Sequence, residues 1–201
     1  MKKLLFLVTV VTFVTLAATA QVKLKVEPAA AFIKKATSAL KSQGTQQTMR
    51  AVAPGEECGV FTSTETNKEG VKYQAAKEYL IISNDGVTGF AFTMYNTVYK
   101  ENKYVIIRGL ALESGVCVDN TSKVTVTFED GETLVLKNFE DANCKGVVQA
   151  FFGKALNNEA SLEALKTKKV RSLKLEGIEK TVVKSLSEGN QQQLQGTLKC
   201  L

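Results

Sequence analysis

The chain has 201 residues, with 26 basic and 20 acidic side chains, four cysteines and no histidine. The absence of histidine excludes hydrolases with a histidine base, imidazole acid–base catalysis and histidine-containing zinc sites. The formal charge of +6 is mild and scattered, so the sequence lacks the dense basic face of a nucleic-acid-binding protein, and no nucleic-acid partner is expected.

The first twenty residues have the layout of a secretory signal peptide. Lys2 and Lys3 precede an apolar run from Leu4 to Ala18, and a small-x-small exit, Ala18-Thr19-Ala20, comes before Gln21. The run is shorter than the roughly 20 residues that span a bilayer, so we expect cleavage and no transmembrane anchor afterwards. The sequence therefore predicts an exported protein, periplasmic or secreted.

Cleavage at this point changes the size and charge of the working protein. Removing twenty residues from 201 leaves 181, which is enough for one domain with a real core. Removing Lys2 and Lys3 from the 26 basic residues leaves 24 against 20 acidic ones, a formal charge of +4. We expect a signal peptide at 1–20, an N-terminal helix and flexible linker at 21–57, and a single β-rich domain at 58–201.

One short amphipathic helix is predicted near the new N-terminus. Pro28 suits a first helical turn, Phe32, Ala36 and Leu40 recur every four residues, and Gly44 supplies a stop. Residues 43–57 are poor in large apolar side chains and contain several helix and strand breakers, which indicates a linker.

Beyond Cys58 the pattern changes to alternation with a period of two, which indicates an antiparallel, meander-like sheet. The run from Tyr104 to Leu112 has apolar residues on both parities, so it is expected to be a central strand covered on both faces. The other expected strands are Tyr79–Ile82, Phe90–Tyr99, Val124–Phe128, Leu134–Leu136 and Val147–Phe152.

Two hairpin turns are expected. Asn84-Asp85-Gly86 joins the strand at 79–82 to the residues from Val87 onward. A three-residue loop, Glu129-Asp130-Gly131 with Gly131 in the left-handed region, pairs Val126 with Leu134 and keeps the apolar residues on one face.

The C-terminal part is expected to contain two short helices. Asn158 is placed to cap a helix carrying Leu162 and Leu165, and 170–175 returns as a strand. The last segment is either one long helix interrupted at Gly189 or a strand followed by a helix capped by Ser187. We favour the second, because glycine in mid-helix costs about 1 kcal/mol relative to alanine. The expected fold class is α+β: a predominantly antiparallel β meander, sandwich- or barrel-like, with a short N-terminal helix and two short C-terminal helices.

Four cysteines remain after cleavage, Cys58, Cys117, Cys144 and Cys200. An even number in an exported chain indicates disulfides, and no two of them have the short spacing of a zinc knuckle or a redox motif. Of the three connectivities, we prefer Cys144 with Cys200 and Cys58 with Cys117.

The sequence offers no established catalytic, cofactor or metal motif. Phosphate-binding glycine loops and an Asp-x-Asp-x-Asp-Gly calcium loop are missing, so no cofactor or metal is expected. Ser38-Ala39-Leu40-Lys41 matches the Ser-x-x-Lys of penicillin-recognising enzymes without their other motifs, and is interpreted as an exposed helix face. Asn120-Thr121-Ser122 fits the glycosylation pattern but lies in an expected loop. A carbohydrate platform is poorly supported, because the chain has no tryptophan and its aromatic residues, such as Phe90, Phe92, Phe151 and Phe152, are expected in the core.

Two groups of charged residues remain as candidates. A carboxylate pair would allow hydrolysis, and the acids near expected strand ends are Glu113, Asp119, Asp130, Glu132, Glu140 and Asp141. The densest basic cluster is interpreted as a solvated helix end and strand face, although it would also attract an acidic surface. Its members are Lys166, Lys168, Lys169, Arg171 and Lys174.

The segment from about 104 to 201 resembles a group of small exported bacterial proteins with no assigned function. The resemblance rests on motifs in chain order: Phe128, Asp130 and Gly131; Cys144; Leu162 and Leu165; Val170 and Arg171; and Lys199-Cys200-Leu201. It implies a fold and export but no activity. The leading hypothesis is a non-enzymatic binding or envelope-associated module with a protein or envelope partner; the alternatives are a hydrolase using acidic residues and a protease-inhibitor-like module.

Overall fold

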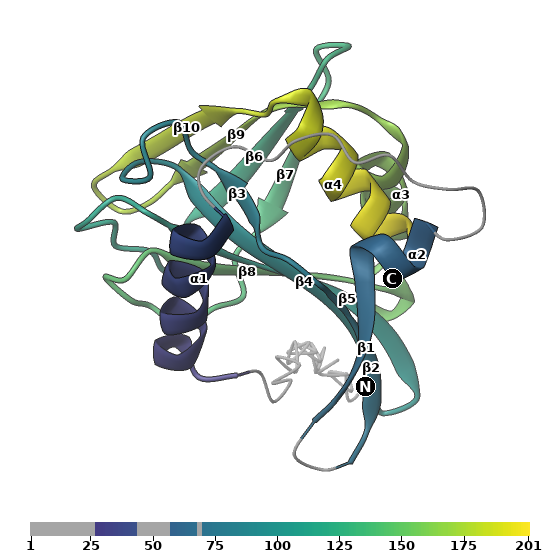
Figure 1. Ribbon diagram of the computed structural model, residues 1–201. Coiled ribbons are helices and arrows are strands. Elements are labelled where there is room, and N and C mark those ends of the chain that lie inside the picture. Colours follow the sequence, from purple (N-terminus) through teal and green to yellow (C-terminus); the bar gives the residue numbers. More distant parts are fainter. Residues whose placement is uncertain (1–26, 44–56, 68–69) are drawn as a thin grey trace, which may run out of the picture.

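Two antiparallel sheets and the helices around them form the protein (Figure 1). The structure, a computed structural model, describes residues 27–43, 57–67 and 70–201. The expected α+β class is confirmed, including the N-terminal helix and the two C-terminal helices. The expected signal peptide and residues 44–56 of the expected linker lie outside the described residues. The boundary between an N-terminal helix and linker at 21–57 and a β-rich domain at 58–201 therefore stays a prediction.

The larger sheet has six strands in the order β1-β2-β4-β5-β8, with β3 also paired to β4. Its strands are β1 (Thr62–Thr66), β2 (Lys72–Ala76), β3 (Leu80–Ile82), β4 (Phe90–Tyr99), β5 (Asn102–Ala111) and β8 (Val147–Phe152). As expected, β5 is central: it pairs with β4 on one side and β8 on the other, and its residues from Tyr104 to Ala111 are buried.

The smaller sheet has four strands in the order β10-β9-β6-β7. They are β10 (Thr181–Ser185), β9 (Val170–Glu176), β6 (Lys123–Phe128) and β7 (Thr133–Lys137). The predicted hairpin is confirmed: Val126 pairs with Leu134, and Gly131 has a φ of 88°. The other predicted turn also joins antiparallel strands, but β4 begins only at Phe90, because Asp85 binds the backbone N–H groups of Val87 and Thr88 within the loop.

The main core lies between the inner faces of the two sheets, and helices α3 (Glu159–Thr167) and α4 (Glu188–Lys199) close one end of it. Ser187 caps α4 as expected, with its hydroxyl accepting from the backbone N–H of Asn190, and Leu194 and Leu198 are buried. Asn158 occupies the cap position of α3, but its side chain binds Gly153 and Phe151 instead of the helix.

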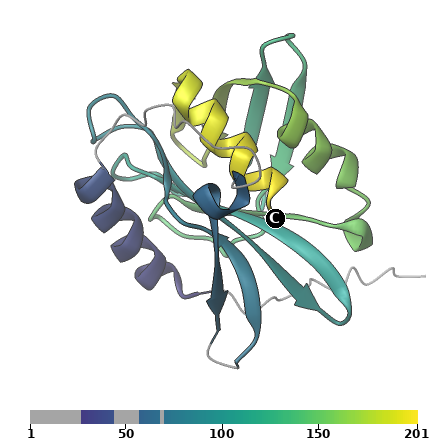
Figure 2. The same ribbon diagram turned by 45° about the vertical axis from the view of Figure 1, so that its right-hand side comes forward.

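Helix α1 (Ala29–Gln43) lies on the opposite face of the six-stranded sheet from α3 and α4, as Figures 1 and 2 show from two directions. Its apolar side chains recur every four residues, so they lie along one side of the helix and pack against the sheet. Phe32 and Ala36 are 1% and 0% exposed, and they pack in a second, smaller core with Ile81, Leu110 and Val147. The expected helix therefore covers the outer face of the sheet.

The disulfide pairing differs from the preferred one. The structure joins Cys58 to Cys200 and Cys117 to Cys144. The preference was wrong because it omitted α2 (Glu57–Phe61), a helix that the sequence analysis did not predict and that packs against α4. This packing places Cys58 next to Cys200, close to the C-terminal end of the chain. Cys144 lies instead beside Cys117, where an isolated antiparallel bridge joins Val118 to Asn143.

Strands β1 and β2 were also not predicted. Their sequences, TSTET and KYQAA, are mostly polar; only Thr62 and Ala75 are buried, and the other residues are exposed or half-buried. No helix among the described residues is long and apolar enough to cross a membrane.

Candidate functional site

Four of the six candidate carboxylates are engaged in separate structural contacts. Asp119 binds Thr121 and Ser122 of its own loop, while Asp130 and Glu132 both bind Lys168, at 2.9 and 2.5 Å. Glu140 pairs with Arg108. Glu113 and Asp141 make no side-chain contact to a partner within the described part of the chain.

Two of these carboxylates, Asp119 and Asp130, are held in the ionised form. Hydrogen bonds from Thr121 hold the pKa of Asp119 below its usual range. The hydrogen bond from Lys168 does the same for the pKa of Asp130. A general acid for glycoside hydrolysis needs the opposite, a raised pKa. Among the described residues, no group of three or more cysteine, aspartate and glutamate side chains is placed to hold a metal ion.

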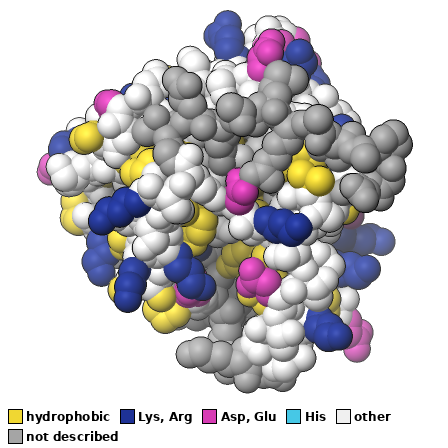
Figure 3. All heavy atoms as spheres, viewed as in Figure 1, with side chains coloured by type: hydrophobic (Ala, Val, Ile, Leu, Met, Phe, Trp, Pro, Cys, Tyr) yellow, Lys and Arg dark blue, Asp and Glu magenta, His cyan; other side chains and the backbone are white. Residues whose placement is uncertain are grey.

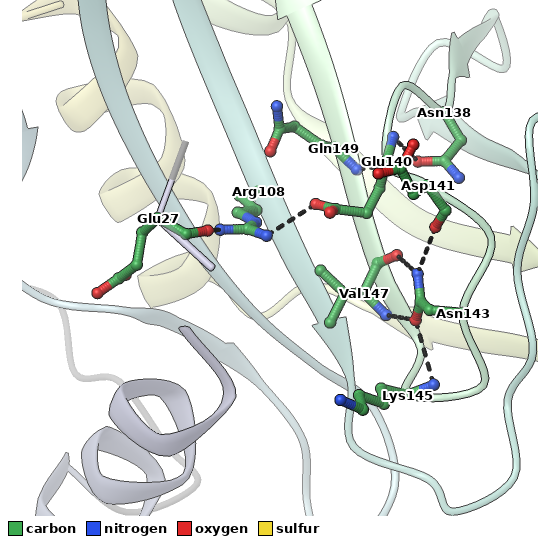
Figure 4. A network of polar contacts seen from close by, with 9 residues as sticks. All are labelled: Glu27, Arg108, Asn138, Glu140, Asp141, Asn143, Lys145, Val147 and Gln149. Carbon is green, nitrogen blue, oxygen red and sulfur yellow. Dashed lines mark hydrogen bonds and ion pairs between the residues drawn. The ribbon is translucent and has the colours of Figure 1, made fainter. Parts of the chain in front are cut away.

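A buried arginine occupies the outer face of the six-stranded sheet. Arg108, in the middle of β5, is 2% exposed. Its guanidinium donates to a carboxylate oxygen of Glu140 at 2.8 Å and to the backbone carbonyl of Glu27, and it stacks over the ring of Phe32 at 4.8 Å (Figure 4). These contacts join the sheet to the residues at the start of α1 and to the loop that carries Glu140.

The loop that presents Glu140 is internally crosslinked. Asn138 and Asn143 hold it by hydrogen bonds to the backbone on both sides, including Gln149 and Val147 of β8 (Figure 4). The Cys117–Cys144 disulfide fixes its far end. On the α1 side of the arginine, Tyr79 stacks on Phe32, and burial is the main reason that its pKa is raised to about 12. We interpret Arg108 and Glu140 as a clamp that holds α1 and this loop on the sheet.

The same loop bears on the inhibitor hypothesis, because Lys145 is exposed beside a disulfide. The backbone N–H of Lys145 donates to the side-chain oxygen of Asn143, and the chain bends at Cys144 and Lys145. Strand-like docking into a protease cleft uses free backbone N–H groups on an extended segment. The loop geometry does not present that form.

A cavity between the sheets is too small for an organic ligand. Its volume is about 20 Å³, which is enough for roughly one water molecule. Its lining is mostly apolar, with contributions from Phe92, Ile107 and Val148.

The predicted basic cluster is divided by the fold. Lys168 is engaged by Asp130 and Glu132, whereas Lys174 lies on the outer face of the four-stranded sheet and pairs there with Glu176 at 2.9 Å. Lys166 is half-buried on α3, and Lys169 and Arg171 are exposed near the start of β9. On the face of the molecule that Figure 3 shows, basic side chains lie in several separate groups.

The outer face of the four-stranded sheet is an ordered grid of three rows across four strands. The register places the residues of each row directly opposite one another, and the apolar residues between the rows point into the core, while Lys184 of β10 is half-buried and donates to the Thr88 hydroxyl. The rows, in the order β10, β9, β6, β7, are Thr181-Glu176-Lys123-Lys137, Val183-Lys174-Thr125-Val135 and Ser185-Ser172-Thr127-Thr133. We call these twelve residues the hydroxyl–lysine face.

This face is open and its polar groups are available. Val135 and Val183 are 54% and 55% exposed at the two ends of the middle row. The six serine and threonine hydroxyls of the grid have no hydrogen-bond partner in the described part of the chain. No aromatic residue belongs to the grid. The face therefore presents hydroxyl groups and lysines at the regular spacing of the strands, about 4.8 Å.

The sequence analysis did not identify Lys123 and Lys137 as candidate site residues. Their signal was the period-two alternation itself, which places Lys123, Thr125 and Thr127 on one side of β6 and Val124, Val126 and Phe128 on the other. What the sequence does not show is the order of the strands, which places β9 beside β6 and β10 on the far side of β9.

Comparison with known proteins gives no match: no protein-family model, no curated protein and no solved structure is significantly similar to this chain.

Proposed function

We propose that this chain is an exported, non-enzymatic binding module that attaches to a polysaccharide of the cell envelope through the hydroxyl–lysine face. The observation that carries the proposal is the grid of unpartnered hydroxyls on an open sheet face. The bottom row, Ser185-Ser172-Thr127-Thr133, consists of hydroxyls alone and extends over roughly 14 Å at the usual strand spacing. Repeated hydroxyl groups suit a polymer that itself repeats hydroxyl groups.

Other classes of partner suit the face less well. Protein interfaces are enriched in aromatic residues and arginine and depleted in lysine, and the grid has lysines without aromatics. Single-stranded nucleic acid is bound by stacking bases on aromatic rings, and a duplex needs many phosphate contacts. A sugar polymer can be held by hydrogen bonds alone, while Val135 and Val183 offer apolar contact at either end of the middle row.

The proposed location follows from the sequence and agrees with the fold. Two disulfides are typical of proteins from oxidising compartments, and the pattern of residues 1–20 is that of an export signal. We therefore propose a periplasmic or secreted location. We also propose that the chain belongs to the group of small exported bacterial proteins that it resembles. Hydrolysis by acidic residues remains the alternative.

Affinity electrophoresis tests the proposal. The protein is run through gels containing dextran, alginate or dextran sulfate, and we expect at least one polymer to retard it. Thr127→Val with Thr133→Val removes two hydroxyls without changing side-chain shape and should weaken the retardation. Thr66→Val with Thr97→Val is the matched control, since these threonines lie on the other sheet and also have no hydrogen-bond partner in the described part of the chain.

Two results would overturn the proposed function. One is migration unaffected by all three polymers. The other is retardation that the Thr127 and Thr133 variant preserves in full.

A further inference from the structure

Two lysines face each other across the β6–β7 pair at one end of the hydroxyl–lysine face. The register places Lys123 directly opposite Lys137, and both are exposed. Like charges directly opposite on neighbouring strands are destabilising. The sheet therefore places two like charges on directly opposed residues, where a threonine or glutamate at either position would avoid the repulsion.

The groups around this pair do not neutralise it. Glu176 is the neighbour of Lys123 on β9, but its carboxylate pairs with Lys174 at 2.9 Å. The ammonium group of Lys137 lies 5.6 Å from the centre of the Phe139 ring, and this ring carries no charge that could neutralise it. Lys123 has no interaction partner in the described part of the chain.

The charges of the grid leave a net positive face. Its ionised side chains are three lysines and Glu176. Because Lys174 and Glu176 compensate each other, the excess is concentrated at Lys123 and Lys137. Both lysines are exposed; Lys123 lies directly opposite Glu176 on the neighbouring strand, and Lys137 lies one strand farther away.

We propose that Lys123 and Lys137 form the anion subsite of the face, so that the bound polymer is an acidic polysaccharide carrying carboxylate or sulfate groups. This inference rests on the proposed function and specifies its ligand. An anionic group lying between the two ammonium groups would relieve their repulsion, while neighbouring sugar hydroxyls bind Thr125 and the bottom row. A neutral polymer would leave the repulsion in place.

Binding to paired probes tests the inference. Dextran and dextran sulfate share a backbone and differ in charge, and alginate supplies carboxylates. We expect retardation by dextran sulfate and alginate but not by dextran. Lys123→Gln with Lys137→Gln should weaken binding about 3- to 10-fold, as expected for the loss of two exposed ion pairs. Lys123→Arg with Lys137→Arg should preserve it.

The matched control is Lys72→Gln with Lys103→Gln, which makes the same change in net charge on the other sheet, at two lysines without a partner in the described residues. Binding should also weaken as ionic strength rises from about 0.05 to about 0.5 M, because salt screens exposed charges. If the control weakens binding as much as the Lys123 and Lys137 variant, attraction is a property of net charge, and the inference is overturned.

The outcomes separate this inference from the proposed function. Equal retardation by dextran and dextran sulfate, together with loss in the Thr127 and Thr133 variant, would leave the face as a polysaccharide site and overturn its acidic specificity. Binding of anionic lipid vesicles or duplex DNA more tightly than either acidic polysaccharide would overturn the assignment of the ligand.

Discussion

Arg108 and Glu140 form an ion pair of 2.8 Å on the outer face of the six-stranded sheet, where Arg108 is 2% exposed and the side chain of Glu140 is 16% exposed. The arginine also binds the backbone of Glu27 and stacks on Phe32. One buried cation thus connects β5, the start of α1 and the 138–146 loop.

Replacing Glu140 by leucine should destabilise the protein by about 3 kcal/mol, because it leaves Arg108 buried without a counter-charge. Replacing both residues by leucine should restore most of that loss, since an apolar pair carries no desolvation cost. Urea unfolding followed by circular dichroism measures both changes. Two single-site losses that simply add in the double variant would contradict the clamp.

Gly131 and Gly59 form a matched pair for testing backbone conformation. At both positions an added Cβ meets no atom within 4 Å, but only Gly131 has a positive φ, of 88°. Gly131→Ala should therefore cost about 1 kcal/mol or more. Gly59→Ala, within α2, should be neutral or stabilising by up to about 1 kcal/mol. Thermal unfolding of the two variants is the measurement, and a shift of the same sign in both would contradict the turn geometry.

The disulfide pairing is open to direct mapping. Proteolysis without reduction should yield one linked peptide pair containing Cys58 and Cys200 and another containing Cys117 and Cys144. Mass spectrometry identifies both. Peptides linking Cys144 to Cys200 would contradict the placement of α2 against α4.

Acid sensitivity should follow from Asp119. Its pKa is lowered in the folded state by hydrogen bonds from Thr121, so its stabilising contribution is complete above the unfolded pKa, about 3.9. That contribution disappears as the pH falls from there through the lower folded value. Asp119→Asn should consequently show a smaller loss of stability between about pH 4 and pH 2 than the unmodified protein. Asp141→Asn is the control, since Asp141 has no side-chain partner in the described residues. Equal acid sensitivity of the two variants would count against this role of Asp119.

Local patterns predicted much of the fold. The expected strands Phe90–Tyr99 and Val147–Phe152 have the bounds of β4 and β8, and the register argument around Gly131 gives the observed Val126–Leu134 pair. These predictions succeeded because alternation and turn chemistry depend on neighbouring residues. Strands β1 and β2 were missed because they are stabilised by pairing at the sheet edge more than by burial, so they lack an apolar alternation.

The candidate site was less predictable. Lys123 and Lys137 are fourteen positions apart, and their opposition follows from the hairpin register, but the whole grid needs the long-range placement of β9 and β10. Arg108 lies in a run that reads as an ordinary central strand, and its burial depends on α1, which comes from far earlier in the chain. Sequence alternation shows which side of a strand a residue occupies, but not what covers that side.

Chemical-shift mapping with a defined polysaccharide tests the central claim most directly. Alginate is titrated into isotope-labelled protein, and backbone amide shifts are followed along the chain. The account predicts that the largest shifts lie on β6, β7, β9 and β10, centred on Lys123, Thr125 and Lys137, with little change in α1 and β5. Shifts centred on α1 and Arg108, or no shifts at saturating alginate, would contradict it.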